Sequence, residues 1–327
     1  MLDIEVTERG IRSGGRPRRY LMAGPAGVRC GELPVVVDLH GSGITPEDYF
    51  RITHGPWLAE RALVVVPQAW TPFDILGALP YEVNATLPPA TAWNVPGTPL
   101  PGEAAPRVGA DGVDEIAFLG DLLDDLAECH GVDRRRIHVR GYSGGARLAS
   151  HLAAAVPSRL ASVCCVAGVR FPDRLAPEMP PLLAVHGLRD ALNPFAGGTK
   201  PHWLESVPDV VAQWAAHSGC TETREVWAPH GAVETRHVRP DGTCPVRLVV
   251  LSETEHSWPG TEERHHAAIF GAPGAVSATR IHWDFVAEVE SAMSRRWPRS
   301  SSAPRRSLIV EGRDEGDRHP AHGLRRC

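Results

Sequence analysis

Six short apolar runs are distributed along the chain, and longer amphipathic segments separate most of them. The runs span residues 33–41, 61–69, 136–143, 160–168, 180–187 and 246–253. Most are apolar almost throughout, which is typical of strands that are buried on both faces. Short buried strands that alternate with helices indicate a mostly parallel sheet covered by helices. We therefore predict an α/β fold with a doubly wound, mostly parallel sheet.

The segments between the runs have a helical period. Within residues 113–131, one helical stripe is apolar and acidic residues lie opposite it; the stripe comprises Ile116, Leu119, Leu122, Leu123 and Leu126. Residues 144–160, 207–219 and 278–293 are predicted to form further helices.

Two segments interrupt this alternation. Residues 70–110 lie between a strand and a helix, are dense in Pro, Gly and Ala, and contain four aromatic residues. We interpret them as a long excursion over the rim of the sheet, near the functional site, because long ordered loops tend to be functional. Residues 298–327 lack an apolar period and are rich in Arg, Ser and Pro, so we expect a disordered tail. The prediction is one domain over residues 1–297.

Charge and hydropathy exclude several classes of partner. The formal net charge is −5, whereas a protein that binds nucleic acid presents a markedly basic surface. No apolar run approaches the roughly 20 residues needed to cross a bilayer, so we expect no membrane partner. The first 15 residues lack the basic start and apolar core of a signal peptide. We expect a cytoplasmic protein; the alternative is a secreted one whose leader the sequence lacks. Oligomeric state is not predicted.

The cysteines and histidines do not form a metal-binding pattern. None of the seven cysteines forms a CxxC pair or a Cys/His cluster with zinc spacing, and we expect neither a metal nor an organic cofactor. The adjacent His265 and His266 cannot easily bind one ion and are interpreted as a solvated helix start. Cys220 and Cys244 bracket a polar, loop-rich segment and are the one pair considered for a disulfide.

A serine lies between glycines where a predicted strand meets a predicted helix. Residues 141–145, GYSGG, fit the pattern Gly-x-Ser-x-Gly. A hydroxyl projected from such a sharp turn requires a strained backbone, and the residues two before and two after it must be small. The following helix directs its positive end and its free N–H groups at the site. The pattern predicts that Ser143 is a nucleophile, although alone it also fits an inert turn.

A serine nucleophile needs a base and an acid that orients the base. In a doubly wound sheet both should follow the serine, each just beyond a later strand. Asp190 follows the run 180–187, and His256 follows the run 246–253. The order Ser143, Asp190, His256 is the order that this architecture demands. Glu253 and Glu255 compete for the orienting role, but Glu255 is adjacent to the base and badly placed to face its ring.

Stabilising a tetrahedral oxyanion requires two N–H donors, one of them from the loop after an early strand. The sequence LHGSG at 39–43 supplies such a loop, and Thr45 with Pro46 starts a helix after it. We assign the donors to the backbone N–H groups of Ser42 and Gly144. His40 is interpreted as structural, since this chemistry needs backbone rather than an imidazole.

Several stretches resemble a known family. LHGSG, AWN (92–94), residues 136–154, HGLRDALNPF and HSWPG (256–260) are similar to the esterase branch of the α/β-hydrolases that includes polyhydroxybutyrate depolymerases and feruloyl and acetylxylan esterases. The resemblance covers roughly residues 15–295. It implies the α/β-hydrolase fold, the triad of Ser143, Asp190 and His256, and substrate contacts from Trp93, Tyr142 and Trp258. Family members often carry a disulfide where Cys220 and Cys244 stand.

The chain also departs from that family. Glu255 stands where the family usually has glycine directly before the catalytic histidine, and a carboxylate there is expected to alter the local charge. The family is mainly secreted, which disagrees with the N-terminus and favours a small ester over an extracellular polymer.

The sequence therefore predicts a serine hydrolase that cleaves a small-molecule or oligomeric carboxylic ester through an acyl-enzyme. One alternative keeps the acyl-enzyme but transfers the acyl group, as an acyltransferase or a macrocyclising thioesterase in secondary metabolism would. A non-catalytic binding protein that inherited the fold is a third hypothesis.

Overall fold

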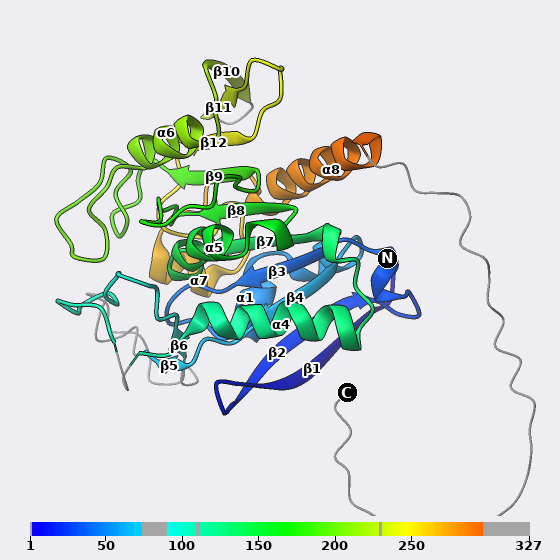
Figure 1. The fold of residues 1–327 in the computed structure, drawn as a ribbon. Helices are drawn as coiled ribbons and strands as arrows, with labels where there is room; N and C mark the ends of the chain where they lie inside the picture. The colour runs from blue at the N-terminus through cyan, green and yellow to red at the C-terminus, as the bar shows by residue number, and fades with distance from the viewer. Residues whose placement is uncertain (1, 74–89, 109–111, 229–230, 297–327) are drawn as a thin grey trace, which may run out of the picture.

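The computed structural model describes residues 2–73, 90–108, 112–228 and 231–296 of the 327-residue chain. All six predicted runs form strands: β3 (Val35–Leu39), β4 (Leu63–Pro67), β7 (Ile137–Tyr142), β8 (Ser162–Val166), β9 (Leu182–Gly187) and β12 (Val246–Leu251). They lie side by side in the order β4-β3-β7-β8-β9-β12, and every neighbouring pair is parallel (Figure 1). The reversal of strand order at β3 is that of a doubly wound sheet, as predicted.

An antiparallel hairpin extends the sheet at each edge, and the sequence analysis did not predict either one. These hairpins are β1 (Ile4–Ser13) with β2 (Arg16–Pro25), and β10 (Glu222–Ala228) with β11 (Ala232–Val238). Gly14 and Gly15 join β1 to β2 with φ angles of 55° and 77°, the positive values that a tight hairpin turn requires. The hairpins bring the sheet to ten strands.

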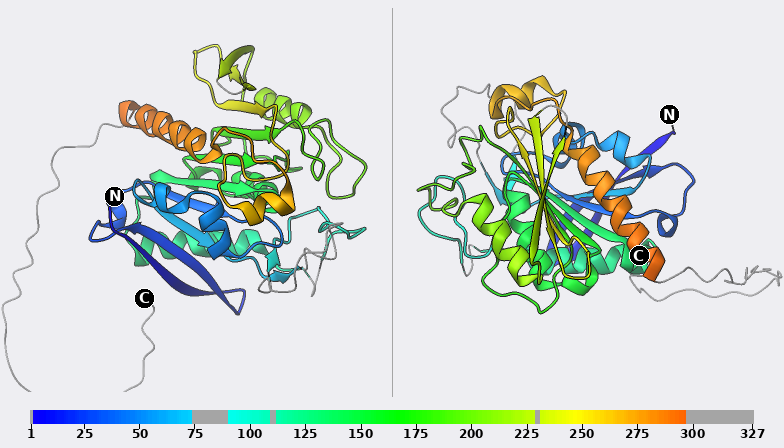
Figure 2. Two further views of the ribbon diagram at one scale, coloured as in Figure 1. Left: turned by 180° about the vertical axis from the view of Figure 1, so that it is seen from behind. Right: turned by 90° about the horizontal axis from the view of Figure 1, so that it is seen from above.

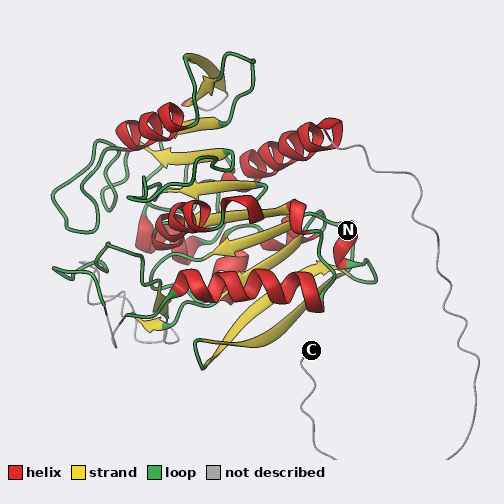
Figure 3. Ribbon diagram, viewed as in Figure 1, coloured by secondary structure: helices red, strands yellow, loops and turns green. Residues whose placement is uncertain are grey.

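Helices cover both faces of the sheet (Figures 2 and 3). One face carries α4 (Glu115–Cys129), α5 (Gly144–Ala155) and α6 (Val207–His217). The other face carries α1 (Pro46–Ile52), α2 (Gly55–Ala59), α7 (Arg264–Phe270) and α8 (Ala278–Arg296). Short 3-10 turns lie at Cys30–Glu32, Arg134–Arg136 and Pro157–Arg159. The predicted helices all form, and α7 begins where His265 and His266 were interpreted as a helix start, whereas α2 was not predicted.

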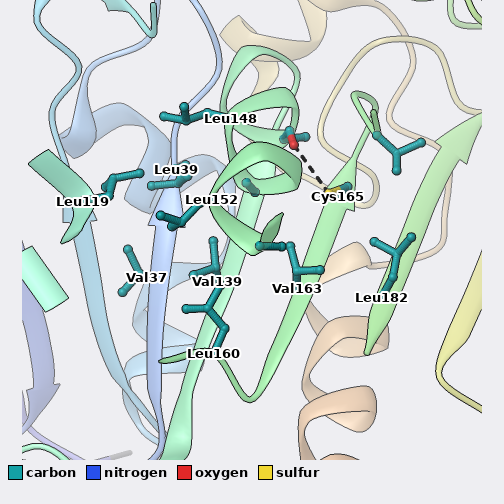
Figure 4. Close-up of a cluster of buried hydrophobic side chains, with 14 of the residues drawn as sticks. Val37, Leu39, Leu119, Val139, Leu148, Leu152, Leu160, Val163, Cys165 and Leu182 are labelled. Atoms are coloured by element: carbon teal, nitrogen blue, oxygen red, sulfur yellow. Dashed lines mark hydrogen bonds between the residues drawn. The ribbon is translucent and has the colours of Figure 1, made fainter. Parts of the chain in front are cut away.

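The core has two layers, one on each face of the sheet. Alternate residues of β3 point to opposite layers, so Val35 and Val37 lie in one apolar cluster and Val36 in the other. In the first layer, Leu148 and Leu152 of α5 pack beside Val139 and Val163 of the strands beneath (Figure 4). Each such buried side chain contributes about 1.5–3 kcal/mol to folding. This packing holds α5, and therefore its first residues, rigidly on β7 and β8.

The excursion at 70–110 contains a small sheet of its own. β5 (Thr71–Pro72) pairs antiparallel with β6 (Thr91–Ala92). Residues 74–89 and 109–111 of the excursion, and the predicted tail at 298–327, lie outside the described residues. In the part of the chain that the structure describes, no helix has the length and apolar character needed to cross a membrane.

Candidate active site

Ser143 occupies a sharp turn between β7 and α5. Its φ of 52° and ψ of −114° fall in a region that non-glycine residues rarely adopt. The flanking glycines are required by contact: a Cβ on Gly141 would lie 2.3 Å from the carbonyl oxygen of Gly145, and a Cβ on Gly145 would lie 2.2 Å from that of Leu39. The turn therefore has the strained backbone and the small neighbours that the sequence predicted.

The structure brings the three predicted triad residues into one hydrogen-bonded chain. The Oγ of Ser143 lies 3.0 Å from Nε2 of His256, and Nδ1 of His256 lies 2.7 Å from Oδ2 of Asp190. Asp190 follows β9 and His256 follows β12, at the same end of the parallel sheet as the turn after β7. Both are buried, at 3% and 4% exposure. This geometry lets His256 accept the serine proton while Asp190 holds its ring.

The Asp190 carboxylate is held in its ionised form by its partners. Its Oδ1 accepts hydrogen bonds from the backbone N–H groups of Leu192 (3.0 Å) and Asn193 (2.7 Å). Burial acts to raise its pKa, but the interactions with His256, His186 and the Asn193 N–H outweigh burial and leave the pKa below its usual value. The neighbouring His186 instead keeps a lowered pKa because of burial, and its Nε2 contacts the carbonyl oxygen of Asn193 at 2.8 Å. A charged Asp190 is the state that orients His256 as a base.

The competing acids are turned to other partners. Glu253 is exposed and pairs with Arg189 at 2.6 Å. Glu255 accepts a hydrogen bond from the backbone N–H of Ala272 at 3.0 Å, and its carboxylate lies over Gly271. Glu255 therefore holds the loop that follows α7. Among the described residues, Asp190 is the carboxylate that contacts His256.

The two predicted oxyanion donors lie together beside the nucleophile. A Cβ on Gly144 would stand 3.6 Å from the backbone N of Ser42 and 2.5 Å from its Oγ. Gly144 is the first residue of α5, so its N–H has no partner within the helix. The loop that carries Ser42 is held by His40, whose Nδ1 contacts the Gly41 carbonyl oxygen at 2.8 Å and whose Nε2 accepts from Ala69 N at 3.1 Å. His40 has the structural role predicted for it.

The prediction that Trp93, Tyr142 and Trp258 contact substrate needs correction. All three side chains are fully buried, and none lines the cavity at Ser143. Trp93 donates from Nε1 to the His40 carbonyl oxygen at 2.8 Å, and Tyr142 donates from its hydroxyl to the His256 carbonyl oxygen. Trp258 packs edge-on against Tyr142 at 5.9 Å between ring centroids. Because protein surrounds each ring on all sides, these residues stabilise the loops that carry the site and do not reach a substrate.

Two further expectations are also corrected. Cys220 and Cys244 are free thiols, whose sulfurs contact the carbonyl oxygens of His237 and Val246 respectively. His266 is buried within α7 rather than solvated, and its Nε2 accepts a hydrogen bond from Trp258 N at 3.0 Å. The described residues contain no group of three or more His, Cys, Asp or Glu side chains placed to hold a metal ion.

A cavity of about 460 Å³ opens onto the serine. It is lined by Ser42, Phe73, Pro101, Gly102, Glu103, Ala104, Ser143, Arg147, Leu192, Asn193, Lys200, Pro201, His202, His256 and Phe270. Phe73 and residues 101–104 belong to the 70–110 excursion, which therefore forms one wall. The loops after β9 and the excursion extend from the same end of the sheet (Figure 1).

The 70–110 excursion was expected near the site, but several other residues of the cavity wall were not predicted. For Phe270 only the start of its helix was predicted, and Lys200 and His202 lie in a loop without a periodic pattern. The position of Arg147 could have been inferred from sequence. It lies four residues after Ser143 in a predicted helix, and this spacing places it on the same helix face as Ser143.

Comparison with known proteins comes to the same architecture. No family model matches the chain. Among curated proteins it is similar to "Putative esterase NocK" of Nocardia uniformis subsp. tsuyamanensis, with 27% identity over 294 residues that cover 83% of this chain and 79% of that protein. Among solved structures it superposes on the acetyl xylan esterase from Aspergillus awamori with a TM-score of 0.53 and 15% identity, covering 81% of this chain and 99% of that one. The chain has the α/β-hydrolase fold. On this fold, Ser143, Asp190 and His256 lie just beyond the ends of β7, β9 and β12.

Proposed function

We propose that the protein is a serine esterase that cleaves carboxylic esters through an acyl-enzyme. The observation that carries the proposal is the chain from Ser143 Oγ through His256 to Asp190, with contacts of 3.0 and 2.7 Å at the floor of the cavity. The similarity to a protein named as a putative esterase supports the same activity. The resemblance of HSWPG and the serine turn to the polyhydroxybutyrate depolymerase and feruloyl esterase branch supports an ester as substrate.

In the proposed mechanism, Ser143 Oγ attacks the ester carbonyl carbon while its proton passes to His256 Nε2. The carbonyl oxygen becomes an oxyanion that accepts hydrogen bonds from the N–H groups of Ser42 and Gly144. Each such donor contributes about 10²–10³ in kcat in comparable enzymes. His256 then protonates the leaving alcohol, and the acyl group stays on Ser143. Water attacks the acyl-enzyme with His256 again as the base, which releases the acid and restores the serine.

Hydrolysis of short aryl esters with a pre-steady-state burst tests the acyl-enzyme. A burst of phenol whose amplitude equals the enzyme concentration is the expected result when deacylation is the slower step. Adding primary alcohols or amines separates hydrolysis from acyl transfer, because a transferase diverts the acyl group into the new ester or amide. A protein that neither releases phenol from these esters nor reacts with a fluorophosphonate at Ser143 would be a binding protein on this fold.

A further inference from the structure

Arg147 is a buried cation beside Ser143, and no described residue forms an ion pair with it. It lies one turn into α5, is only 2% exposed, and lines the cavity with Ser143 and His256. Its Nε is buried without a hydrogen-bond partner, and no described residue pairs with its guanidinium in an ion pair. A buried charge normally has an opposite charge against it, because an unpaired one is costly.

The surroundings of Arg147 do not compensate its charge. Lys200 and His202 also line the cavity, and Arg170 lies close enough for its charge to act on Arg147. Burial, with the like charge of Arg170, lowers the pKa of Arg147 to about 9, which still leaves the group protonated at neutral pH. The one acid in the described lining, Glu103, is engaged by Arg107 at 2.9 Å. The cavity is therefore a basic site open to an anion.

The guanidinium stands on the oxyanion side of the nucleophile. The Cβ position of Gly144 lies 3.5 Å from Arg147 Nη2 and 3.6 Å from Ser42 N. In the proposed mechanism the leaving alcohol must lie at His256, because His256 protonates it. The oxyanion is bound by the N–H groups of Ser42 and Gly144, so the acyl chain is the part of the ester that is left for Arg147 to bind.

Resting on the esterase function proposed above, we propose that the natural substrate carries a carboxylate on its acyl group, and that Arg147 is the specificity-determining residue that binds it. A guanidinium matches a carboxylate with two parallel N–H···O bonds, which gives both charge pairing and orientation. Lys200 adds a second positive charge across the cavity. The ester is thus a monoester of a short dicarboxylic acid or a close equivalent.

Three esters test this substrate class: one with a carboxylate on the acyl group, one without a carboxylate, and one with the carboxylate on the alcohol part. Monoethyl glutarate has the acyl carboxylate, ethyl 5-oxohexanoate replaces it with a methyl ketone of similar size, and 4-acetoxybutanoate has the carboxylate in the alcohol part. Hydrolysis is followed by titration of released acid. We expect kcat/KM for monoethyl glutarate to exceed that for the ketone by about tenfold to hundredfold, the range for hydrogen bonds to a charged group. Equal values, or a preference for 4-acetoxybutanoate, overturn the proposal.

Variants at Arg147 assign the preference to this residue. In Arg147→Met the ratio of kcat/KM between glutarate ester and ketone should fall to about one, and Arg147→Lys should retain part of it. Arg135→Met removes the same charge at the opposite end of β7, where Arg135 pairs with Asp133, and should keep the wild-type ratio. A purely structural role for Arg147 predicts equal losses on both esters and an unchanged ratio, which contradicts the proposal.

Two further measurements distinguish a failure of the Arg147 proposal from a failure of the proposed esterase function. Inhibition of the wild-type enzyme by glutarate but not by the uncharged heptane-2,6-dione needs no variant, so it tests the carboxylate preference even if Arg147→Met fails to fold. Labelling of Ser143 by a fluorophosphonate reports the nucleophile independently of the acyl group. Labelling without a carboxylate preference refutes only the role of Arg147, whereas absence of both labelling and hydrolysis refutes the esterase function with it.

Discussion

The hydroxyl of Tyr142 donates a hydrogen bond to the carbonyl oxygen of His256 and so ties the residue before the nucleophile to the residue that bears the base. The two rings also lie 5.4 Å apart, centroid to centroid. The strand β7 and the loop after β12 are 114 residues apart in sequence at this contact. The spacing of Ser143 and His256 is therefore held by two hydrogen bonds: their own, and the one from Tyr142, the residue before Ser143, to the His256 carbonyl oxygen.

Removing that bond should affect activity more than an equivalent loss elsewhere. Tyr142→Phe is expected to lower the free energy of unfolding by about 1–3 kcal/mol and kcat about tenfold, because a small displacement of His256 is costly. Tyr49→Phe is the matched control, since it deletes a buried hydroxyl that donates to Asp38 at 3.0 Å. Urea denaturation and ester hydrolysis compare the two. Equal losses of kcat in both variants would argue against a role in positioning His256.

The assignment of the orienting acid can be tested against its sequence competitors. Asp190→Asn should lower kcat by about 10⁴-fold, the loss seen when a triad acid becomes an amide and the histidine tautomer is wrong. Glu253→Gln and Glu255→Gln should leave kcat within a few-fold of wild type, because their carboxylates contact Arg189 and the Ala272 N–H. A loss at Glu255→Gln as large as that at Asp190→Asn would reverse the assignment.

The nucleophile turn should not tolerate a methyl group. In Gly145→Ala the new Cβ would lie 2.2 Å from the Leu39 carbonyl oxygen, so β3 or α5 must move. We expect a loss of unfolding free energy of about 1–3 kcal/mol or more, with loss of labelling at Ser143. Gly120→Ala in α4 meets only Arg159 Nη1 at 4.0 Å and should stabilise by about 0.5–1 kcal/mol through helix propensity. Thermal unfolding of the two variants should give shifts of opposite sign.

Acid should destabilise the fold through its buried neutral histidines. Burial lowers the pKa of His40 to about 4, whereas an unfolded histidine titrates near 6.5. Between these values the unfolded chain binds a proton that the folded one does not, so stability falls as pH falls, by about 1.4 kcal/mol per pH unit for this residue. His40→Gln keeps an acceptor for Ala69 N and should have a shallower slope in urea denaturation between pH 7 and 5. Identical slopes for wild type and variant would contradict this origin.

Strands and helices with continuous apolar patterns could be predicted from sequence, and the edge hairpins could not. Runs such as 33–41 are buried on both faces, so their composition alone identifies them. β1, with the sequence IEVTERGIRS, is exposed along most of its length and carries charges that are equally typical of a loop. The Gly14-Gly15 pair is a local signal for a hairpin turn, but the charged strand beside it gives no apolar pattern to support that signal.

The triad was predictable because three independent segments had to agree in order and position. The burial of the aromatic residues beside the site could not be predicted, because it depends on which segments cover each ring. Trp93 and Trp258 are aromatic residues next to site loops, yet both are enclosed by protein. For Arg147 the sequence offers only its position four residues after Ser143 in a predicted helix, whereas its burial and its place in the cavity lining depend on packing.

Covalent labelling tests directly whether Ser143 is the nucleophile. Wild-type protein is incubated with a fluorophosphonate, digested, and analysed by mass spectrometry, with Ser143→Ala and Ser42→Ala in parallel. We expect one adduct, on the peptide that contains Ser143, and no adduct in Ser143→Ala together with a loss of ester hydrolysis of about 10⁶-fold. Ser42→Ala should still be labelled, because its backbone N–H remains. Labelling or hydrolysis that survives in Ser143→Ala would show that Ser143 is not the nucleophile.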